Sequence, residues 1–403
     1  MRPESSALQD LVRQLHHDGT PWLPCGLASR LDWGAPVAPG CGSLSCAALD
    51  RILEHNPGDF TITVEAGAPL AAVQQALAEH GQWLAVDRPW GTGQAPASAG
   101  SIGGLVARGL AGGYRQRYLG IRDQLIGIRV LRADGVEARA GGKVVKNVAG
   151  YDLMRLFTGS WGSLGLITEV TLRTLPLPPQ RRGLLVQGSL QALAELSRKL
   201  LHSSLTPERV DWWSASLAAA AGLEAQPLVV VGLASIDAAS LNHQIATLRS
   251  STALACRDLA AEELHHLHIV ARGATADGVA LPRWLLRLGV NPDQISSLLA
   301  APELDTLAVD LAVSSGLGMA WTLEDPAGPS EPMAERIARL RQLCGRLGGH
   351  LTVLRQPAES SLASWEDAPS RPLIEAVKYC FDPRAQLAPN RLPGVRPTRA
   401  QCS

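Results

Sequence analysis

The chain has 403 residues, 46% hydrophobic and 18% charged, which is typical of a globular protein with more than one core. Its 37 basic and 37 acidic residues balance, so the charge does not favour nucleic acid or an anionic membrane as a partner. No apolar run is long enough to cross a membrane, and no signal peptide is visible. The seven scattered cysteines predict reduced thiols, so we expect a cytoplasmic protein of at least two domains.

The first part of the chain combines short helices and strands with many glycines. Apolar residues at helical spacing predict helices at 8–15 and 70–77. Alternating or continuous apolar residues predict strands at 60–65, 125–131 and 166–172. The turn signal after the second of these strands predicts a hairpin with a further strand. This part therefore predicts a mixed α and β domain with long loops.

A proline-rich stretch at 176–179 marks the predicted boundary between a domain at 1–180 and a domain at 181–355. Beyond it, we expect strands at 184–186, 228–233, 307–313 and 319–323, and helices at 190–201, 238–248 and 332–347. This alternation predicts an α+β layer with helices on one face of an antiparallel sheet. The remaining segment, 356–403, contains a further helix from about residue 370.

Three segments rich in small residues precede the boundary, at 24–29, 98–107 and 159–168. Glycine permits close backbone approach, and successive N–H groups in such loops form concave anion sites. Ser29 and Ser101 could add hydroxyl donors. Each loop alone is weak evidence, but the three together favour a large phosphate-bearing cofactor. The arrangements typical of a nicotinamide Rossmann site and of a P-loop are absent from the sequence.

Longer motifs carry a resemblance to a known family. They are Thr63 to Leu70, Ser101-Ile102-Gly103-Gly104, Gly142 to Leu153, and Phe381-Asp382-Pro383 with Leu387 to Pro393. With these motifs the chain resembles the PCMH-type, or vanillyl-alcohol-oxidase, family of FAD-binding proteins. Within that family it looks like the FAD-binding subunits of glycolate oxidase and the related D-2-hydroxyacid dehydrogenases. The resemblance covers about residues 20–180 and 375–395.

The resemblance implies the α+β fold class, with two α+β subdomains that clamp FAD, an α+β cap domain at 181–355, and a segment at 356–403 that returns to the FAD domain. The pyrophosphate would lie on 25–29 and on the loop around 101–104, and the strand at 166–168 would offer backbone groups. The first loop has no histidine, so we expect noncovalent FAD. The residues that the resemblance implies at the cofactor are Pro24, Cys25, Gly26, Leu27, Ala28, Ser29, Gly100, Ser101, Gly103, Gly104, Ala107, Gly112, Arg122, Asp123, Gly165, Ile167 and Asn390.

The chain departs from the family's dehydrogenases at the substrate apparatus. They usually carry a glutamate where Trp161 lies, and a cap motif with paired histidines that hold a metal. The nearest candidate here, His265-His266-Leu267-His268, lacks the acidic Gly-rich turn and is interpreted as a polar helix face, so we expect no metal site. The departures favour the E-type subunit of a complex with a D-type flavin subunit and an iron–sulfur subunit. Such a chain could be peripheral at the inner membrane through these partners.

Several polar residues have two interpretations. Lys143 and Lys146 could neutralise a phosphate or a substrate carboxylate, or could be solvated loop lysines. Arg122-Asp123 is expected as an ion pair or backbone brace. Tyr151-Asp152 could order a loop beside the flavin, or Asp152 could begin a helix. None of them identifies a catalytic base.

Three functions therefore stay open. The first is a redox subunit that binds FAD within a complex oxidising glycolate to glyoxylate. The second is a self-sufficient flavin dehydrogenase for a 2-hydroxy acid or another small alcohol, which requires a base near the flavin. The third is a structural subunit that has kept the fold. The sequence leaves the substrate, the electron acceptor and the oligomeric state undetermined.

Overall fold

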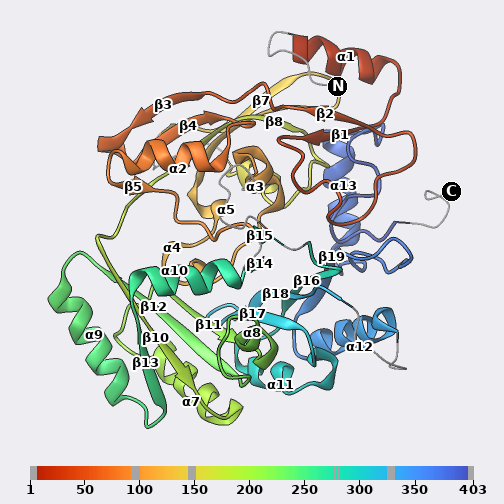
Figure 1. Ribbon diagram of the computed structural model, residues 1–403. Coiled ribbons are helices and arrows are strands. Elements are labelled where there is room, and N and C mark those ends of the chain that lie inside the picture. The colour runs from red at the N-terminus through yellow and green to blue at the C-terminus, as the bar shows by residue number, and fades with distance from the viewer. Residues whose placement is uncertain are drawn as a thin grey trace.

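The protein is described by a computed structural model over residues 7–91, 100–143, 151–275, 278–279, 281–324 and 332–397. Figure 1 shows two lobes, one above the other, and each is built on its own antiparallel sheet. We call residues 7–176 with 371–391 the first lobe, and residues 180–355 the second lobe. No helix within the described ranges has the length and apolar character needed to cross a membrane.

The sheet of the first lobe has five strands in the order β3-β4-β8-β6-β7. They are β3 (Ile52–Asn56), β4 (Thr61–Glu65), β6 (Leu125–Leu131), β7 (Glu137–Gly141) and β8 (Leu166–Arg173). The helices packed against it are α2 (Leu70–Ala78), α3 (Ile102–Arg108), α5 (Ile121–Gln124) and α6 (Met154–Phe157). The short pair β5 (Gln82–Trp83) and β9 (Leu175–Pro176) and the helix α4 (Arg115–Tyr118) lie at the side facing the second lobe. The predicted helices and strands of this lobe are confirmed, because their apolar spacing already matches the faces that are buried.

The two ends of the chain meet in the first lobe. The helix α1 (Leu8–His17) and the parallel pair β1 (Trp22–Cys25) and β2 (Gly42–Ser45) pack together in one cluster that includes Leu387. Trp22 donates its N–H to Gln386 O at 2.8 Å, and Ala388 returns a bond to Trp22 O at 2.8 Å. The helix α13 (Arg371–Phe381) lies beside them, with the rings of Phe381 and Phe157 edge to face at 5.4 Å. The C-terminal segment therefore completes the core that the N-terminal segment begins.

The sheet of the second lobe has eight antiparallel strands in the order β13-β10-β12-β11-β17-β18-β16-β19. They are β10 (Gln180–Gln187), β11 (Arg209–Trp213), β12 (Leu228–Ser235), β13 (Ala255–Leu259), β16 (Trp284–Gly289), β17 (Ala308–Ala312), β18 (Leu317–Thr322) and β19 (His350–Arg355). The helices are α7 (Leu190–Leu201), α8 (Ala215–Ala220), α9 (Ala238–Ser250), α10 (Ala261–Val270), α11 (Ile295–Leu299) and α12 (Met333–Arg346). A small hairpin joins β14 (Ala274–Thr275) to β15 (Gly278–Val279).

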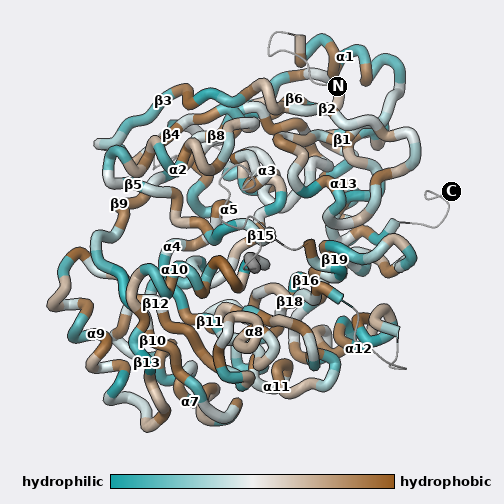
Figure 2. Tube along the Cα trace, in the orientation of Figure 1, coloured by the Kyte–Doolittle hydropathy of each residue, from teal (hydrophilic) through white to brown (hydrophobic). Residues whose placement is uncertain are grey.

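The expectation that helices cover only one face of this sheet is wrong. The cluster that contains α7, α9, α11 and α12 covers one face, whereas α8 and α10 cover the other, together with Trp33 and Trp90 of the first lobe. Figure 2 shows the central strands as hydrophobic stretches. The reason is visible in β12, where every residue but the last is buried, so both faces of the strand require apolar cover. The α+β class is confirmed, and we propose the division at 180 and 355 as the domain boundaries.

Candidate functional site

The first small-residue segment follows β1 and lies against the second segment. Cys25 O accepts the N–H of Cys46 at 2.7 Å, and Gly26 O accepts the hydroxyl of Ser45 at 3.0 Å, so β2 fixes the start of this loop. A Cβ on Gly26 would lie 2.0 Å from Ser101 Oγ. Only glycine therefore lets the two loops approach each other at this point.

The second segment forms the start of α3. Ser101 precedes the helix, and its Oγ accepts the N–H of Gly104 at 3.2 Å, which is an N-cap. Gly103 donates its N–H to Ala66 O at 2.7 Å, and a Cβ on Gly103 would lie 2.7 Å from the Cβ of Ala66. The helix is thus held directly against the turn that follows β4. The residues Ser98 and Ala99, which begin the predicted segment, lie outside the described residues.

The third segment packs on the end of α3 and on β1. Trp161 has a φ of 56° and donates its N–H to Ala107 O at 2.9 Å. A Cβ on Gly162 would contact the ring of Pro24 at 3.4 Å, and one on Gly165 would lie 3.1 Å from Leu131 O. The three segments, far apart in the sequence, therefore surround one space.

That space is a cavity of about 1310 Å³ when its part open to solvent is included. The predicted cofactor residues that line it are Pro24, Cys25, Gly26, Leu27, Ala28, Ser29, Gly100, Ser101, Gly103, Gly104, Ala107, Gly112, Gly165 and Ile167. Three predicted residues lie elsewhere. Arg122 and Asp123 line a second cavity, with 3.9 Å between their charged groups, and Asp123 accepts the N–H of Gly120 at 3.2 Å. Asn390 has a φ of 70° and precedes Arg391, which does line the first cavity.

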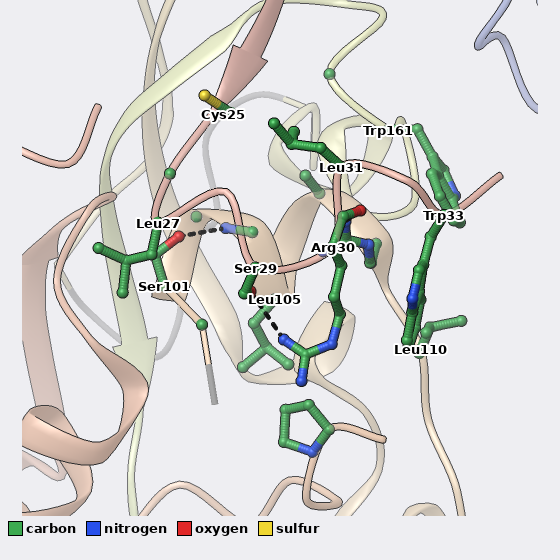
Figure 3. Close-up of a pocket in the computed structure, with 18 of the residues that line it drawn as sticks. Cys25, Leu27, Ser29, Arg30, Leu31, Trp33, Ser101, Leu105, Leu110 and Trp161 are labelled. Carbon is green, nitrogen blue, oxygen red and sulfur yellow. Dashed lines mark hydrogen bonds between the residues drawn. The ribbon is translucent and has the colours of Figure 1, made fainter. Parts of the chain in front are cut away.

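The sequence did not indicate the arginines of this cavity. Arg30 lies in its wall, as Figure 3 shows, and donates to Ser29 Oγ at 3.0 Å and to Trp90 O at 2.9 Å. Burial lowers the pKa of Arg30 to about 10. Further arginines in the lining are Arg88, Arg108, Arg272 and Arg391. A cavity with this many guanidinium groups is suited to a ligand that carries phosphate.

Among these arginines, Arg108 has the surroundings that best suit binding of an anion. Its guanidinium lies 5.5 Å from the ring centres of both Trp33 and Trp161, and burial lowers its pKa to about 9. It donates to Arg30 O, whereas its buried Nε has no hydrogen-bond partner within the described part of the chain. A buried cation with a donor left over and no ion pair to a described residue fits a site that receives an anion. Helical spacing is the signal that could have found it, because Gly104 and Arg108 are four residues apart on one face of α3.

Beside Asp87 of the first lobe, the cavity extends to Arg272 and Met319 of the second lobe. Asp87 accepts the N–H of Gly112 at 2.7 Å. Arg272 lies 3.7 Å from Asp87 and 3.0 Å from Asp310, and all three side chains are buried. This group of charges joins the two lobes beside the cavity.

The described candidates His265, His268, Lys143, Tyr151 and Asp152 do not line the first cavity. His265 and His268 are on α10, and no group of three metal-ligating side chains occurs among the described residues. Asp152 pairs with Arg155 at 3.1 Å before the short α6, whereas Tyr151 is exposed. Lys143 pairs with Glu54. Lys146 and the rest of 144–150 lie outside the described residues.

Comparisons with known proteins identify the cofactor. Residues 2–141 match the family described as FAD binding domain. This part of the chain is therefore similar to an FAD-binding domain. It is 37% identical to glycolate oxidase subunit GlcE of Escherichia coli over 48% of this chain and 53% of that protein. It is 37% identical to D-2-hydroxyglutarate dehydrogenase of Xanthomonas citri over 47% of this chain and 39% of that protein. It is 31% identical to glycolate oxidase subunit GlcD of Bacillus subtilis over 48% of this chain and 40% of that protein.

The matched region thus spans about half, or less, of the length of these curated relatives. A solved structure of alkyldihydroxyacetonephosphate synthase has the same fold, with a TM-score of 0.66 over 96% of this chain and 75% of that chain at 13% identity. The resemblance inferred from the motifs, and FAD as the cofactor, are therefore confirmed.

Proposed function

We propose that this chain is the FAD-binding E-type subunit of an enzyme that oxidises glycolate, or another small 2-hydroxy acid, to the 2-oxo acid. The observation that carries the proposal is the convergence of three loops on one arginine-lined cavity within a chain that is similar to an FAD-binding domain over residues 2–141. Relatives named for both the E-type and the D-type subunit of glycolate oxidase support a role beside a second flavin subunit. We extend the proposal to an iron–sulfur subunit as the electron acceptor.

In this proposal, bound FAD supplies the two-electron chemistry, and the chain supplies binding and charge. The glycines at 26, 103 and 104 let the backbone approach the pyrophosphate, and Arg108 and Arg30 lie where they can neutralise it. Trp33 and Trp161 flank Arg108 and exclude water from its guanidinium. The loops would hold FAD without a covalent bond.

The carboxylates of the cavity favour the subunit role over independent catalysis. Asp87 is the one carboxylate among the described lining residues, and it is already engaged by the N–H of Gly112 and by Arg209 and Arg272. A general base needs a carboxylate or imidazole free to take a proton. The described lining of the first cavity therefore offers no free carboxylate or imidazole, which supports a chain that works with partner subunits.

A self-sufficient dehydrogenase is the second candidate. The observation in its favour is the similarity to proteins named D-2-hydroxyglutarate dehydrogenase and probable D-lactate dehydrogenase. Both candidates bind FAD in the same cavity, so they differ only in whether the isolated chain turns over.

The test is the visible absorption spectrum of the purified chain, followed by glycolate or D-lactate added without oxygen. Flavin bands that persist until partner subunits are added would support the E-type role. Bands that bleach with the chain alone would establish the self-sufficient dehydrogenase. A chain that takes up no FAD at all would reject both and leave a structural subunit.

A further inference from the structure

A second cavity lies between the two lobes, next to the one assigned to FAD. It has an empty volume of about 1650 Å³, including space open to solvent, and shares Arg108, Ala111 and Trp161 with the first cavity. The first lobe contributes Arg115 of α4 to its lining, and the second lobe contributes Arg287 of β16. A ligand in this space would therefore touch both lobes and lie close to the cofactor cavity.

The acidic residues of this second cavity already have partners. Asp123 accepts the N–H of Gly120. Glu366 pairs with Arg341 at 2.7 Å, and Asp367 pairs with Arg371 at 2.8 Å. These carboxylates are thus used in holding their own segments together. They do not compensate the arginines that face the cavity from the other sides.

Strand geometry directs Arg287 toward the first lobe. Leu286 and Leu288 belong to the core under α12, so the residues between them point to the opposite face of the sheet. Arg287 is paired in the sheet with Met319, which lines the cofactor cavity, and with Thr352, which lines the second cavity. Its guanidinium forms no hydrogen bond or ion pair with the residues that the structure describes.

Arg115 approaches Arg287 from the first lobe. Burial lowers the pKa of Arg287, and the nearby positive charge of Arg115 lowers it further. Arg115 also has no carboxylate partner among the described residues. Two like charges that face each other across a partly enclosed space repel, and an anion between them converts that repulsion into two attractions.

We propose that Arg287 and Arg115 bind the carboxylate of a small hydroxy or oxo acid in this second cavity. The inference rests on the proposed function for the choice of a carboxylate, since the guanidinium fork also suits phosphate. With its carboxylate held there, the rest of the acid would extend toward the first cavity past Ala111 and Trp161, two of the residues that line both cavities. The binding energy would come from both lobes at once.

The experiment measures binding without turnover. FAD-loaded protein is titrated with oxalate, which has the carboxylate but no hydrogen to give to the flavin, and separately with inorganic phosphate, by calorimetry. The variants are Arg287→Gln and Arg115→Gln. The matched control is Arg198→Gln, an exposed arginine on α7 outside both cavities. FAD content and melting temperature are recorded for each variant.

We expect oxalate to bind to the wild-type protein and to Arg198→Gln equally. Each of the two cavity variants should weaken binding about tenfold or more, which is about 1.4 kcal/mol. Arg287→Lys should recover only part of the affinity, because an ammonium lacks the fork. Should Arg287→Gln fail to fold, the more exposed Arg115→Gln gives the same answer.

Oxalate affinity that is unchanged in both variants would overturn the proposal. Binding of phosphate with the same dependence on Arg287, and no binding of oxalate, would overturn the carboxylate assignment. Failure of this anion site can be distinguished from failure of the proposed function. If no hydroxy acid bleaches the flavin even after the partner subunits are added, but oxalate still binds through Arg287, the proposed substrate fails and the anion site stands. If glycolate reduces the flavin equally well in both variants, the function stands and the site fails.

Discussion

Asp87 of the first lobe lies 3.8 Å from Arg209 of the second, and both side chains are buried. Arg209 also pairs with Asp211, and the same Asp87 oxygen lies 3.7 Å from Arg272. One carboxylate of the first lobe thus meets two guanidinium groups of the second. The lobes are therefore joined at the cofactor cavity by charge as well as by apolar packing.

The first prediction concerns this junction. Asp87→Asn should lower the stability by about 2 kcal/mol or more, because hydrogen bonds to charged groups contribute about 1.5–3 kcal/mol and the buried arginines lose part of their compensation. Thermal unfolding of the FAD-free chain measures it. Asp10→Asn, which breaks an exposed pair with Arg13, is the control and should have little effect. Equal melting temperatures for both variants would show that the junction contributes no stability.

A second prediction tests the pyrophosphate loop. Gly104→Asp should lose FAD, because like charges about 4 Å apart repel by about 4 kcal/mol at an effective dielectric constant near 20. Gly104→Asn is the matched control, since outside the backbone of α3 and the two neighbouring residues a Cβ at this position would meet only Ser101 Oγ, at 3.2 Å, which leaves room for either side chain. The ratio of flavin to protein absorbance measures retention. Full occupancy in the aspartate variant would move the pyrophosphate away from this loop.

The third prediction uses the cysteines as reporters. Cys25 is half-buried and lines the cofactor cavity, and burial raises the pKa of its thiol, whereas Cys380 is exposed. FAD should protect Cys25 from alkylation by iodoacetamide and leave the labelling of Cys380 unchanged. Mass spectrometry of tryptic peptides from FAD-free and FAD-loaded protein measures both. Labelling of Cys25 that is the same in the two forms would place the cofactor elsewhere.

His268 provides a prediction on pH. Its ring is buried, and burial, with the positive charges of Arg209 and Arg272, holds its pKa well below the ordinary value of 6.5. Below pH 6.5 the unfolded chain binds a proton at this histidine and the folded chain does not, so its contribution to stability is lost as the pH falls. His268→Phe should therefore show a smaller loss of stability between pH 7 and 5 than the wild type. Burial raises the pKa of Asp211 to about 7, so this carboxyl group makes the folded state more stable as the pH falls, which is opposite to the effect of His268. The contribution of His268 is therefore measured as the difference between the wild type and His268→Phe at each pH.

Parallel curves of unfolding free energy against pH for His268→Phe and the wild type would contradict this account. The same variant tests the expectation that these histidines hold no metal. His268 packs edge to face with Tyr114 at 6.4 Å, as a residue of the lobe interface. We expect metal content to be unchanged in the variant.

The glycine-rich loops could be predicted from the sequence, because the need for a residue without a side chain shows directly as glycine at that position. Gly26 and Gly103 tolerate no side chain, since a Cβ at either would meet an atom of the neighbouring segment. The regular helices were also predictable, as in α7, where Leu193, Leu196 and Leu200 are the buried residues. The glycine clusters and the apolar spacing of the helices can both be recognised within a few neighbouring residues of the sequence.

The arginines and the short strands could not be found in the same way. Arg108 and Arg287 have long side chains whose surroundings depend on residues far away in the sequence, such as Trp33 for Arg108 and Arg115 for Arg287. The strands β16 and β19 were not predicted. Each is a brief apolar run that is stabilised as a strand by pairing with its neighbours in the sheet, and this pairing is not visible in the local sequence. Arg122 and Asp123 share a motif with the cofactor loop but lie on α5, which turns them to the second cavity.

The pairing of Trp22 with Leu387 has a consequence for the order of folding. Gln386 reaches Thr20 O at 3.1 Å across 366 positions of sequence, and Lys378 donates to Ser163 O at 2.7 Å. During synthesis, these contacts cannot form until residues 378–388 have left the ribosome, and contacts at such separation are slow to close. The second lobe can complete its sheet once residue 355 has emerged. The first lobe is therefore finished after the second, and newly made chains would become able to retain FAD only once residues 378–388 have emerged.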